Sequence, residues 1–244
     1  MITIKKKHFF FTITEKWFDY KFSWSDLFLP VCYRGLRENN QRLFFGVKKY
    51  TKTAVLALDK PIDELYANFL GSVKRDIKKA TAEGVECYFD NNREKFISFY
   101  NQFAKVKGLS QIDISRADEY AIPEWTCSYA VLNGELLVAH SYLEDNTSGI
   151  VRSMESGSLR FDEQHSSRQI AQANKLLHYH DIKAFTERGL SFYDFGGWQA
   201  SEDGHYLPGL LEFKESFGAY PINIFNFFTY AYELKEKVKK LRRL

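Results

Sequence analysis

The chain has 244 residues, 45% of them hydrophobic and 27% charged, which provides enough apolar material for a sizeable folded core and excludes a disordered polypeptide. No run approaches the roughly 18 apolar residues of a membrane span, and the polar start at residues 1–8 lacks the apolar segment of a signal peptide, so we expect a cytoplasmic protein. Its three cysteines stand far apart without Cys-x-x-Cys spacing and predict neither a disulfide framework nor a metal site.

The positive charge of the chain is concentrated at its C-terminus. The net charge is +3, whereas residues 234–244 alone carry six Lys or Arg and one Glu, so the remaining residues sum to −2. We expect a basic C-terminal helix over residues 233–244. A solvated helix is the simplest interpretation, and weak contact with an anionic membrane surface or with a nucleic-acid phosphate backbone is the alternative.

The first half of the chain predicts short strands followed by an alternation of strands and helices. Residues 1–52 alternate apolar and polar positions, which indicates an N-terminal extension of strands packed on a core. Apolar residues then recur every three or four positions behind Pro61 and behind Asn92, and a glycine ends each helix. The predicted succession is a strand at 53–59, a helix from 61 to 84, a strand at 85–89 and a helix at 92–107.

The second half begins with three consecutive strands. Asn133-Gly134, the strongest short hairpin signal, joins the first two strands. The predicted elements are strands at 126–132, 136–143 and 149–154, a helix at 167–188, a strand at 190–194, a helix at 210–217 and a strand at 222–228. This order predicts an α+β fold with a central mixed, mostly antiparallel sheet flanked by helices.

Two neighbouring motifs carry a family resemblance. Asp-Phe-Gly-Gly at 194–197 ends a predicted strand, and Gly-x-x-x-Phe-Lys-x-x-Phe-Gly at 209–218 follows after a loop. Together with the basic helix 73–84, these motifs resemble the Fem-type branch of the GNAT acyltransferase superfamily, which contains the non-ribosomal aminoacyl transferases of cell-wall synthesis. The resemblance implies a GNAT-like acyltransferase domain at 53–232, although Fem enzymes have two such domains.

The resemblance implies two catalytic residues. Asp194, at the end of the predicted strand, would orient or deprotonate the attacking amine, and a loop cap is its structural alternative. Lys214 would face the reacting carbonyl or a donor phosphate and offset negative charge in the transition state. Without the motif, a helical Lys would be expected in solvent.

Four residues around the first motif are candidate substrate contacts. Gly196 and Gly197 leave the backbone open to close approach by a substrate. Trp198 can stack on a sugar or a base, or it can pack in the core. His205, in the loop between the two motifs, is a candidate acid or base.

Five further residues are candidate donor-binding groups. Backbone amides at the start of the helix that contains Ser167 and Arg168 predict an anion site, but Ser capping explains this start equally well, and the usual GNAT glycine fingerprint is absent. Ser156 and Arg160 lie on the segment that leads into this helix, where the resemblance places a substrate-facing loop. Arg75, on the basic helix, predicts either a groove for a polyanionic donor or a solvated face.

These residues support three functional hypotheses. The leading one is an N-acyltransferase of cell-envelope or polysaccharide biosynthesis, which moves an acyl group from acyl-CoA or a carrier thioester to an amine of a small molecule or glycan precursor. The second is an aminoacyl-tRNA-dependent transferase of Fem type, and the third is a catalytically inactive GNAT-like binding module. We expect no tightly bound cofactor and no metal, because His178 and His180 point to different sides of a helix.

Overall fold

The computed structural model describes residues 1–8, 11–18, 23–37, 46–113, 121–160, 166–198 and 208–241. Its strands form a ten-stranded sheet in the order β1-β2-β3-β10-β4-β9-β8-β7-β6-β5. The strands are β1 (Ile2–His8), β2 (Phe11–Trp17), β3 (Val31–Leu36), β4 (Gly46–Ala57), β5 (Glu86–Phe89), β6 (Trp125–Leu132), β7 (Glu135–Asp145), β8 (Ile150–Ser158), β9 (Phe192–Gly197) and β10 (Tyr220–Thr229). The helices are α1 (Ile62–Asn68), α2 (Gly71–Ala82), α3 (Arg93–Lys107), α4 (Ser167–Glu187), α5 (Pro208–Glu215) and α6 (Tyr230–Leu241), with a 3-10 helix η1 (Trp24–Phe28).

The predicted fold class is confirmed, because helices flank a mixed sheet in which most neighbouring strands pair antiparallel. The chain divides into two compact units. The larger unit comprises residues 54–196 and 206–220, and the smaller unit comprises residues 1–53, 197–205 and 221–244.

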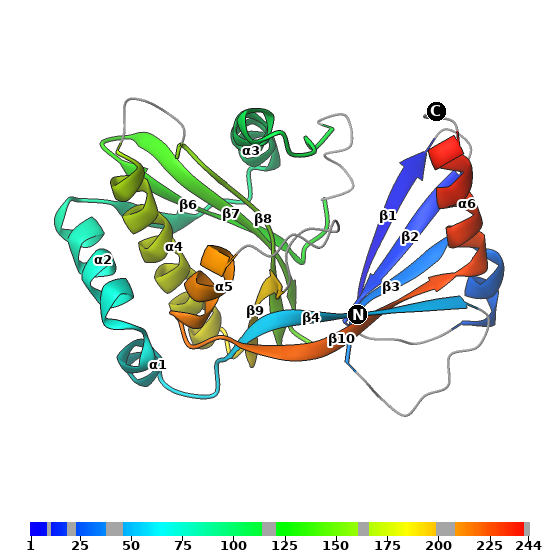
Figure 1. The fold of residues 1–244 in the computed structure, drawn as a ribbon, viewed down its shortest axis with the longest axis horizontal. Coiled ribbons are helices and arrows are strands. Elements are labelled where there is room, and N and C mark those ends of the chain that lie inside the picture. Colours follow the sequence, from blue (N-terminus) through cyan, green and yellow to red (C-terminus); the bar gives the residue numbers. More distant parts are fainter. Residues whose placement is uncertain are drawn as a thin grey trace. The chain divides into compact units, whose positions relative to one another are not determined.

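In the larger unit, strands β5 to β8 pair antiparallel, and β8 pairs parallel with β9. Asn133 and Gly134 have positive φ angles of 51° and 83°, which is the backbone geometry of the tight hairpin predicted between β6 and β7. The long helix α4 packs across β6 and β7 (Figure 1). Helix α3 lies on the opposite face of the sheet, against Gly157 of β8.

The predicted helix from 61 to 84 is wrong in one respect, because it is two helices, α1 and α2. Phe69 and Leu70 between them have ψ angles of 147° and are extended. Phe69 is buried with its ring 5.0 Å from that of Phe217. The backbone N–H of Leu70 donates a hydrogen bond to the carbonyl of Ser216 at 2.9 Å. Contacts with a distant part of the chain therefore interrupt a segment whose local pattern is helical.

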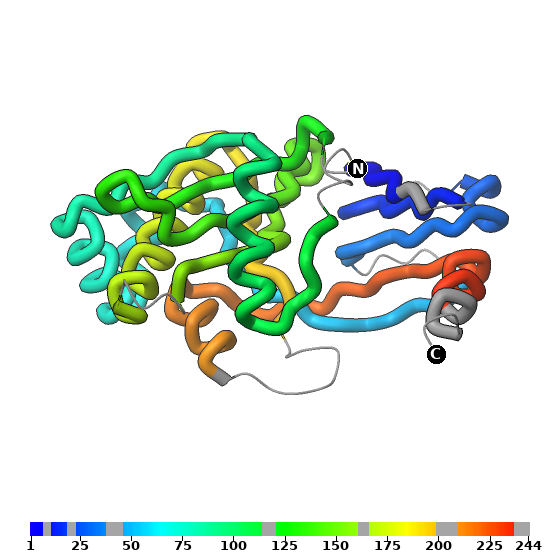
Figure 2. The backbone as a smooth tube through the Cα atoms, turned by 90° about the horizontal axis from the view of Figure 1, so that it is seen from above, coloured from blue at the N-terminus to red at the C-terminus, as the bar shows by residue number. Residues whose placement is uncertain are grey.

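The smaller unit contains the strands β1, β2, β3 and β10, which lie side by side in Figure 2. β2 and β3 pair parallel, whereas β1 with β2 and β3 with β10 pair antiparallel. Its core is a cluster of Val31, Tyr33, Leu36, Phe225 and Phe227. Helix α6 follows β10 directly.

None of the described helices combines the length and the apolar character needed to cross a membrane. Within the same described ranges, no group of three or more His, Cys, Asp or Glu side chains is arranged so that it could hold a metal ion.

Candidate active site

Asp194 lies in β9, and the parallel register with β8 places it opposite Arg152. The guanidinium Nη1 of Arg152 donates to Oδ2 of Asp194 at 2.6 Å, and the backbone N–H of Gly196 donates to Oδ1 at 2.7 Å. The carboxylate is 5% exposed. Because both of its oxygens accept hydrogen bonds, this geometry favours a positioning and electrostatic role over direct removal of a proton.

Lys214 reaches the end of the same strand from helix α5. Its Nζ donates a hydrogen bond to the carbonyl of Gly196 at 3.2 Å, and the residue is 5% exposed. Burial lowers the pKa of Lys214 from 10.5 to about 8, although the negative charge of Asp194 acts in the opposite direction. Lys214 is therefore buried, unlike the solvated lysine that a helix without the motif would be expected to carry.

Arg152, Asp194 and Lys214 form one small cluster of charges around the backbone of Gly196. When Lys214 is protonated, two cations and one carboxylate give this cluster a net positive charge. Gly196 has a φ of +82°, so its backbone turns at this point in a way that favours glycine. The arrangement can attract and stabilise an anion that forms beside the end of β9.

A buried carboxylate, Asp181 of α4, lies behind this cluster. Its Oδ2 accepts hydrogen bonds from Tyr142 at 2.6 Å and Ser128 at 2.7 Å, and it lies 3.0 Å from Nδ1 of His140. Burial alone would raise the pKa of Asp181, but the hydrogen bonds from His140, His180 and Tyr142 outweigh it and lower the pKa below its usual value. Asp181 is thus an ionised group that fastens α4 to strands β6 and β7.

The hydrogen bonds continue from Asp181 toward helix α5. The hydroxyls of Tyr142 and Tyr193 are 2.8 Å apart, and Nδ1 of His178 is 2.8 Å from the Tyr193 hydroxyl. The rings of Phe213 in α5 and of Phe217, which follows the helix, lie 5.3 Å and 5.6 Å from the His178 ring. Burial lowers the pKa of His178 well below its usual value, so its imidazole is neutral. This network holds α4, β9 and the helix that carries Lys214 in one arrangement.

The sequence analysis missed Arg152 and the buried network. Arg152 lies in the predicted strand 149–154, and a parallel pairing of that strand with 190–194 would have suggested a neighbour for Asp194. No sequence signal relates Asp181 to Tyr142, because 39 residues separate them.

Three of the four candidate substrate residues lie at or next to the end of β9. Gly196 lies between Asp194 and Lys214, as described above. Gly197 ends β9, and the backbone N–H of Trp198 donates to the carbonyl of Lys52 at 2.9 Å. His205 lies outside the described residues. The substrate contacts of this group stay a prediction.

The five candidate donor-binding residues stay a prediction as well. Ser156 lies in β8 opposite His140, and Arg160 follows the end of that strand. Ser167 and Arg168 begin α4, where the Ser166 side chain accepts a hydrogen bond from the Gln169 N–H at 3.1 Å and caps the helix. Their side chains and that of Arg75 in α2 are exposed, so all five residues are accessible to a ligand.

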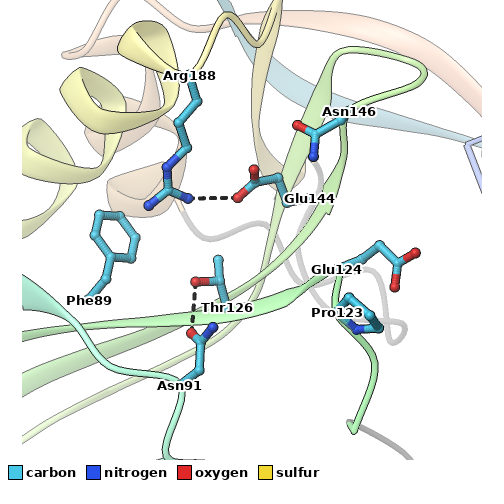
Figure 3. A pocket seen from close by; sticks show the side chains of 8 residues that line it. All are labelled: Phe89, Asn91, Pro123, Glu124, Thr126, Glu144, Asn146 and Arg188. Carbon is cyan, nitrogen blue, oxygen red and sulfur yellow. Dashed lines mark hydrogen bonds and ion pairs between the residues drawn. The ribbon is translucent and has the colours of Figure 1, made fainter.

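A pocket of about 560 Å³ also lies in the larger unit (Figure 3). Its lining contains none of the predicted site residues, and it consists of Phe89, Asn91, Pro123, Glu124, Thr126, Glu144, Asn146 and Arg188. Arg188 donates to Glu144 at 2.7 Å, and Thr126 donates to Asn91 at 2.9 Å. Because these four polar side chains are paired with one another and the motif residues lie elsewhere, we place the candidate active site at Asp194 and Lys214 and not in this pocket.

Comparison with known proteins identifies the fold. No protein-family model and no curated protein matches the chain in sequence. The chain is similar in structure to FemX, with a TM-score of 0.63 and 13% identity over 97% of this chain and 86% of that one. It is similar to L-PGS from Bacillus licheniformis, with a TM-score of 0.59 and 10% identity over 93% and 80%. A third similar structure is the C-terminal domain of a putative lysylphosphatidylglycerol synthetase from Agrobacterium fabrum, with a TM-score of 0.59 and 7% identity over 93% and 80%. These matches show that the chain shares the fold of FemX and of the other two structures, and so confirm the predicted Fem-type fold.

Proposed function

We propose that this protein is an acyltransferase that moves an acyl group from an activated donor to an amine. One observation carries the proposal: the buried amine of Lys214 is held at the end of β9, beside the ion pair of Arg152 and Asp194. Asp194 and Lys214 are the residues that the Fem-type motifs single out, and Arg152 lies beside them through its ion pair with Asp194.

The proposed reaction forms one C–N bond and breaks the bond between the acyl carbon and its leaving group. The neutral acceptor amine attacks the donor carbonyl, whose oxygen becomes an oxyanion, and collapse of this intermediate expels the thiolate or alkoxide of the donor. The amine loses one proton, and the leaving group takes one up. The Lys214 ammonium donates to the oxyanion, an interaction that a buried site strengthens because little water screens it.

Asp194 and Arg152 act on the geometry of this site. Asp194 accepts from the Gly196 N–H, and the carbonyl of the same residue accepts from Lys214, so the carboxylate fixes the peptide that positions the amine. Arg152 keeps Asp194 in place and adds a second positive charge near the reacting carbonyl. Preorganised charges of this kind lower the barrier without rearrangement during the reaction.

For the donor we propose a CoA or carrier thioester, and for the acceptor an amine of a sugar or cell-envelope precursor. Aminoacyl-tRNA is a second candidate donor, because the Fem resemblance implies it and because the chain spans 86% of the FemX chain. A binding module without turnover is the third candidate.

Thermal melting separates these candidates, because a ligand that binds the native state raises its melting temperature. The purified protein is melted with acetyl-CoA, longer acyl-CoAs, charged tRNA and uncharged tRNA. An increase with a CoA thioester supports the thioester donor, and an increase specific to charged tRNA supports the aminoacyl donor. Absence of an effect from every donor contradicts the proposal.

The effective donor is then used to measure turnover with amine acceptors. Lys214→Met should lower turnover by about 100-fold, a typical effect of removing one oxyanion donor. Lys183→Met, which changes an exposed lysine of α4, is the matched control and should leave turnover unchanged. Donor binding without turnover in the unmodified protein would establish the binding module in place of the enzyme.

A further inference from the structure

A group of large apolar side chains is exposed on the smaller unit. Trp24 and Phe28 of η1 are 73% and 83% exposed, and Leu29, which follows η1, is 51% exposed. Tyr230 and Leu234 of α6 are 59% and 66% exposed. We call these five residues the aromatic patch. Exposed apolar residues are common singly, but a cluster of them marks an interaction surface.

The two segments of the aromatic patch are joined at their bases. The hydroxyl of Thr229, immediately before α6, donates to the carbonyl of Leu29 at 2.7 Å and accepts from the Tyr232 N–H at 3.3 Å. Helix α6 therefore begins at the end of η1, and the two elements pack together (Figure 1). Tyr230 and Leu234 are four residues apart and so lie on one face of the helix.

The smaller unit is strongly basic. Its residue ranges contain 17 Lys or Arg and 8 Asp or Glu, a net charge of +9, whereas the larger unit contains 17 and 23, a net charge of −6. Four of the lysines, at positions 235, 237, 239 and 240, belong to α6.

Two acidic residues beside the aromatic patch are paired with lysines. Asp26 of η1 accepts from Lys16 at 2.6 Å and from the Tyr33 hydroxyl. Glu233 of α6 accepts from Lys49 at 2.8 Å. These two carboxylates therefore add little repulsion toward an anionic partner, and the smaller unit as a whole combines the exposed apolar groups with a net positive charge.

We propose that the aromatic patch docks the protein on an anionic lipid bilayer, with Trp24 and Phe28 entering the headgroup region and the positive charge of the smaller unit attracting the lipid phosphates. Aromatic side chains favour the interface of a bilayer, and each nearby Lys or Arg adds attraction to an anionic leaflet. This docking is independent of the acyl transfer proposed above.

Two other partners match the surface less well. A nucleic acid would use the positive charge and could stack on Trp24, but it would leave Leu29 and Leu234 in water. A second copy of the chain would bring two units of net charge +9 together, and like charges repel. A bilayer satisfies both the apolar residues and the charge.

Vesicle flotation with the full chain tests this proposal. Vesicles of phosphatidylcholine mixed with phosphatidylglycerol are compared with vesicles of phosphatidylcholine alone. We expect binding to the anionic vesicles that weakens with added salt, and a decrease in affinity of about tenfold or more for the double variant Trp24→Ser, Phe28→Ser. The matched control is Val106→Ser, Leu109→Ser in the larger unit, whose two residues are 66% and 50% exposed; it should bind as the unmodified protein does.

Several results would overturn the proposal. These are no binding to anionic vesicles, equal binding to both kinds of vesicle, or an equal loss of affinity in the control variant. Two further measurements cover the other partners. If Trp24→Ser, Phe28→Ser abolishes binding of bulk tRNA and vesicles are not bound, the patch is a nucleic-acid surface. If light scattering shows a dimer that this variant dissociates, again without vesicle binding, the patch is a subunit interface. Thermal melting of each variant confirms that it is folded.

Discussion

Lys214 is a residue whose burial opposes folding. A decrease in pKa from 10.5 to about 8 corresponds to roughly 3 kcal/mol, which the folded state loses by holding an ammonium away from water. The hydrogen bond to Gly196 recovers about 1 kcal/mol of this. We therefore predict that Lys214→Met raises the free energy of unfolding at pH 7 by about 2 kcal/mol, measured by urea denaturation, while it lowers turnover by about 100-fold.

The increase in the free energy of unfolding expected for Lys214→Met depends on pH. Below pH 8 the amine is protonated in the folded and unfolded states, so the full cost of burying the charge is present. Between about 8 and 10.5 the unfolded state binds more protons than the folded state, and the stability of the unmodified protein rises with pH. The advantage of Lys214→Met should shrink over this range. A constant advantage from pH 7 to 10 would contradict a decreased pKa, and Lys183→Met should show no gain.

Asp181 has the opposite effect on stability. It is buried and ionised, and it accepts hydrogen bonds from Tyr142 and Ser128. Asp181→Asn replaces the charge by an amide that matches these donors poorly, so we expect a loss of about 3 kcal/mol in the free energy of unfolding near neutral pH. The folded pKa lies below the unfolded one, so this contribution is present above the usual carboxyl pKa and lost as the solution becomes more acidic. The unmodified protein and Asp181→Asn should converge in stability at low pH.

The control for Asp181→Asn is Glu187→Gln, which changes an exposed carboxylate on the same helix. Its effect should stay within about 0.5 kcal/mol. Equal losses in the two variants would mean that the hydrogen bonds to Asp181 contribute little.

At the level of the elements, the end of β9 depends on a glycine. Gly196 has a φ of +82°, and an added Cβ would lie 3.7 Å from the nearest atom, which is ordinary contact. Gly196→Ala should therefore lose about 1 to 2 kcal/mol through backbone strain and not through a clash. Turnover should decrease by more than about tenfold, because the carbonyl that holds Lys214 belongs to this residue.

Gly84, which follows α2, provides a control in which the same backbone strain is introduced away from the proposed active site. Its φ is +84°, and no atom lies within 4 Å of an added Cβ. Gly84→Ala should lose a similar free energy of unfolding in a urea titration and keep full turnover. If both variants lose turnover equally, the effect of Gly196→Ala is a general loss of stability.

Elements with strong local signals were predictable. The hairpin at Asn133-Gly134 and the helix that ends at Gly108 agree with the structure, because a positive φ is readable from residue type. The break at Phe69 was not predictable, since burial against Phe217 causes it. The same division holds at the site. The sequence motif indicates Asp194 and Lys214. Arg152 lies beside Asp194 because β8 pairs parallel with β9 in one particular register, and no local sequence pattern predicts that register.

At the scale of the whole molecule, we expect the two units to respond separately to a destabilising substitution in the smaller unit. A Cβ added at Gly46 in β4 would lie 2.5 Å from the carbonyl oxygen of Phe228 and would overlap the ring of Phe227. Neither is the end of a flexible chain, so Gly46→Ala should destabilise the smaller unit by about 3 kcal/mol. The larger unit has its own core, built on β6 and β7 and covered by α4.

Amide hydrogen exchange can resolve this difference, because it reports local opening along the chain. In Gly46→Ala the amides of β1, β2 and β3 should exchange faster, while those of β6 and β7 keep their protection. Gly71→Ala, at a position where an added Cβ meets no atom within 4 Å, is the control and should change neither set. If protection falls equally in both units of Gly46→Ala, the chain unfolds as one cooperative block. If it falls in the smaller unit alone, the unit that carries Asp194 and Lys214 holds its structure independently of the basic unit.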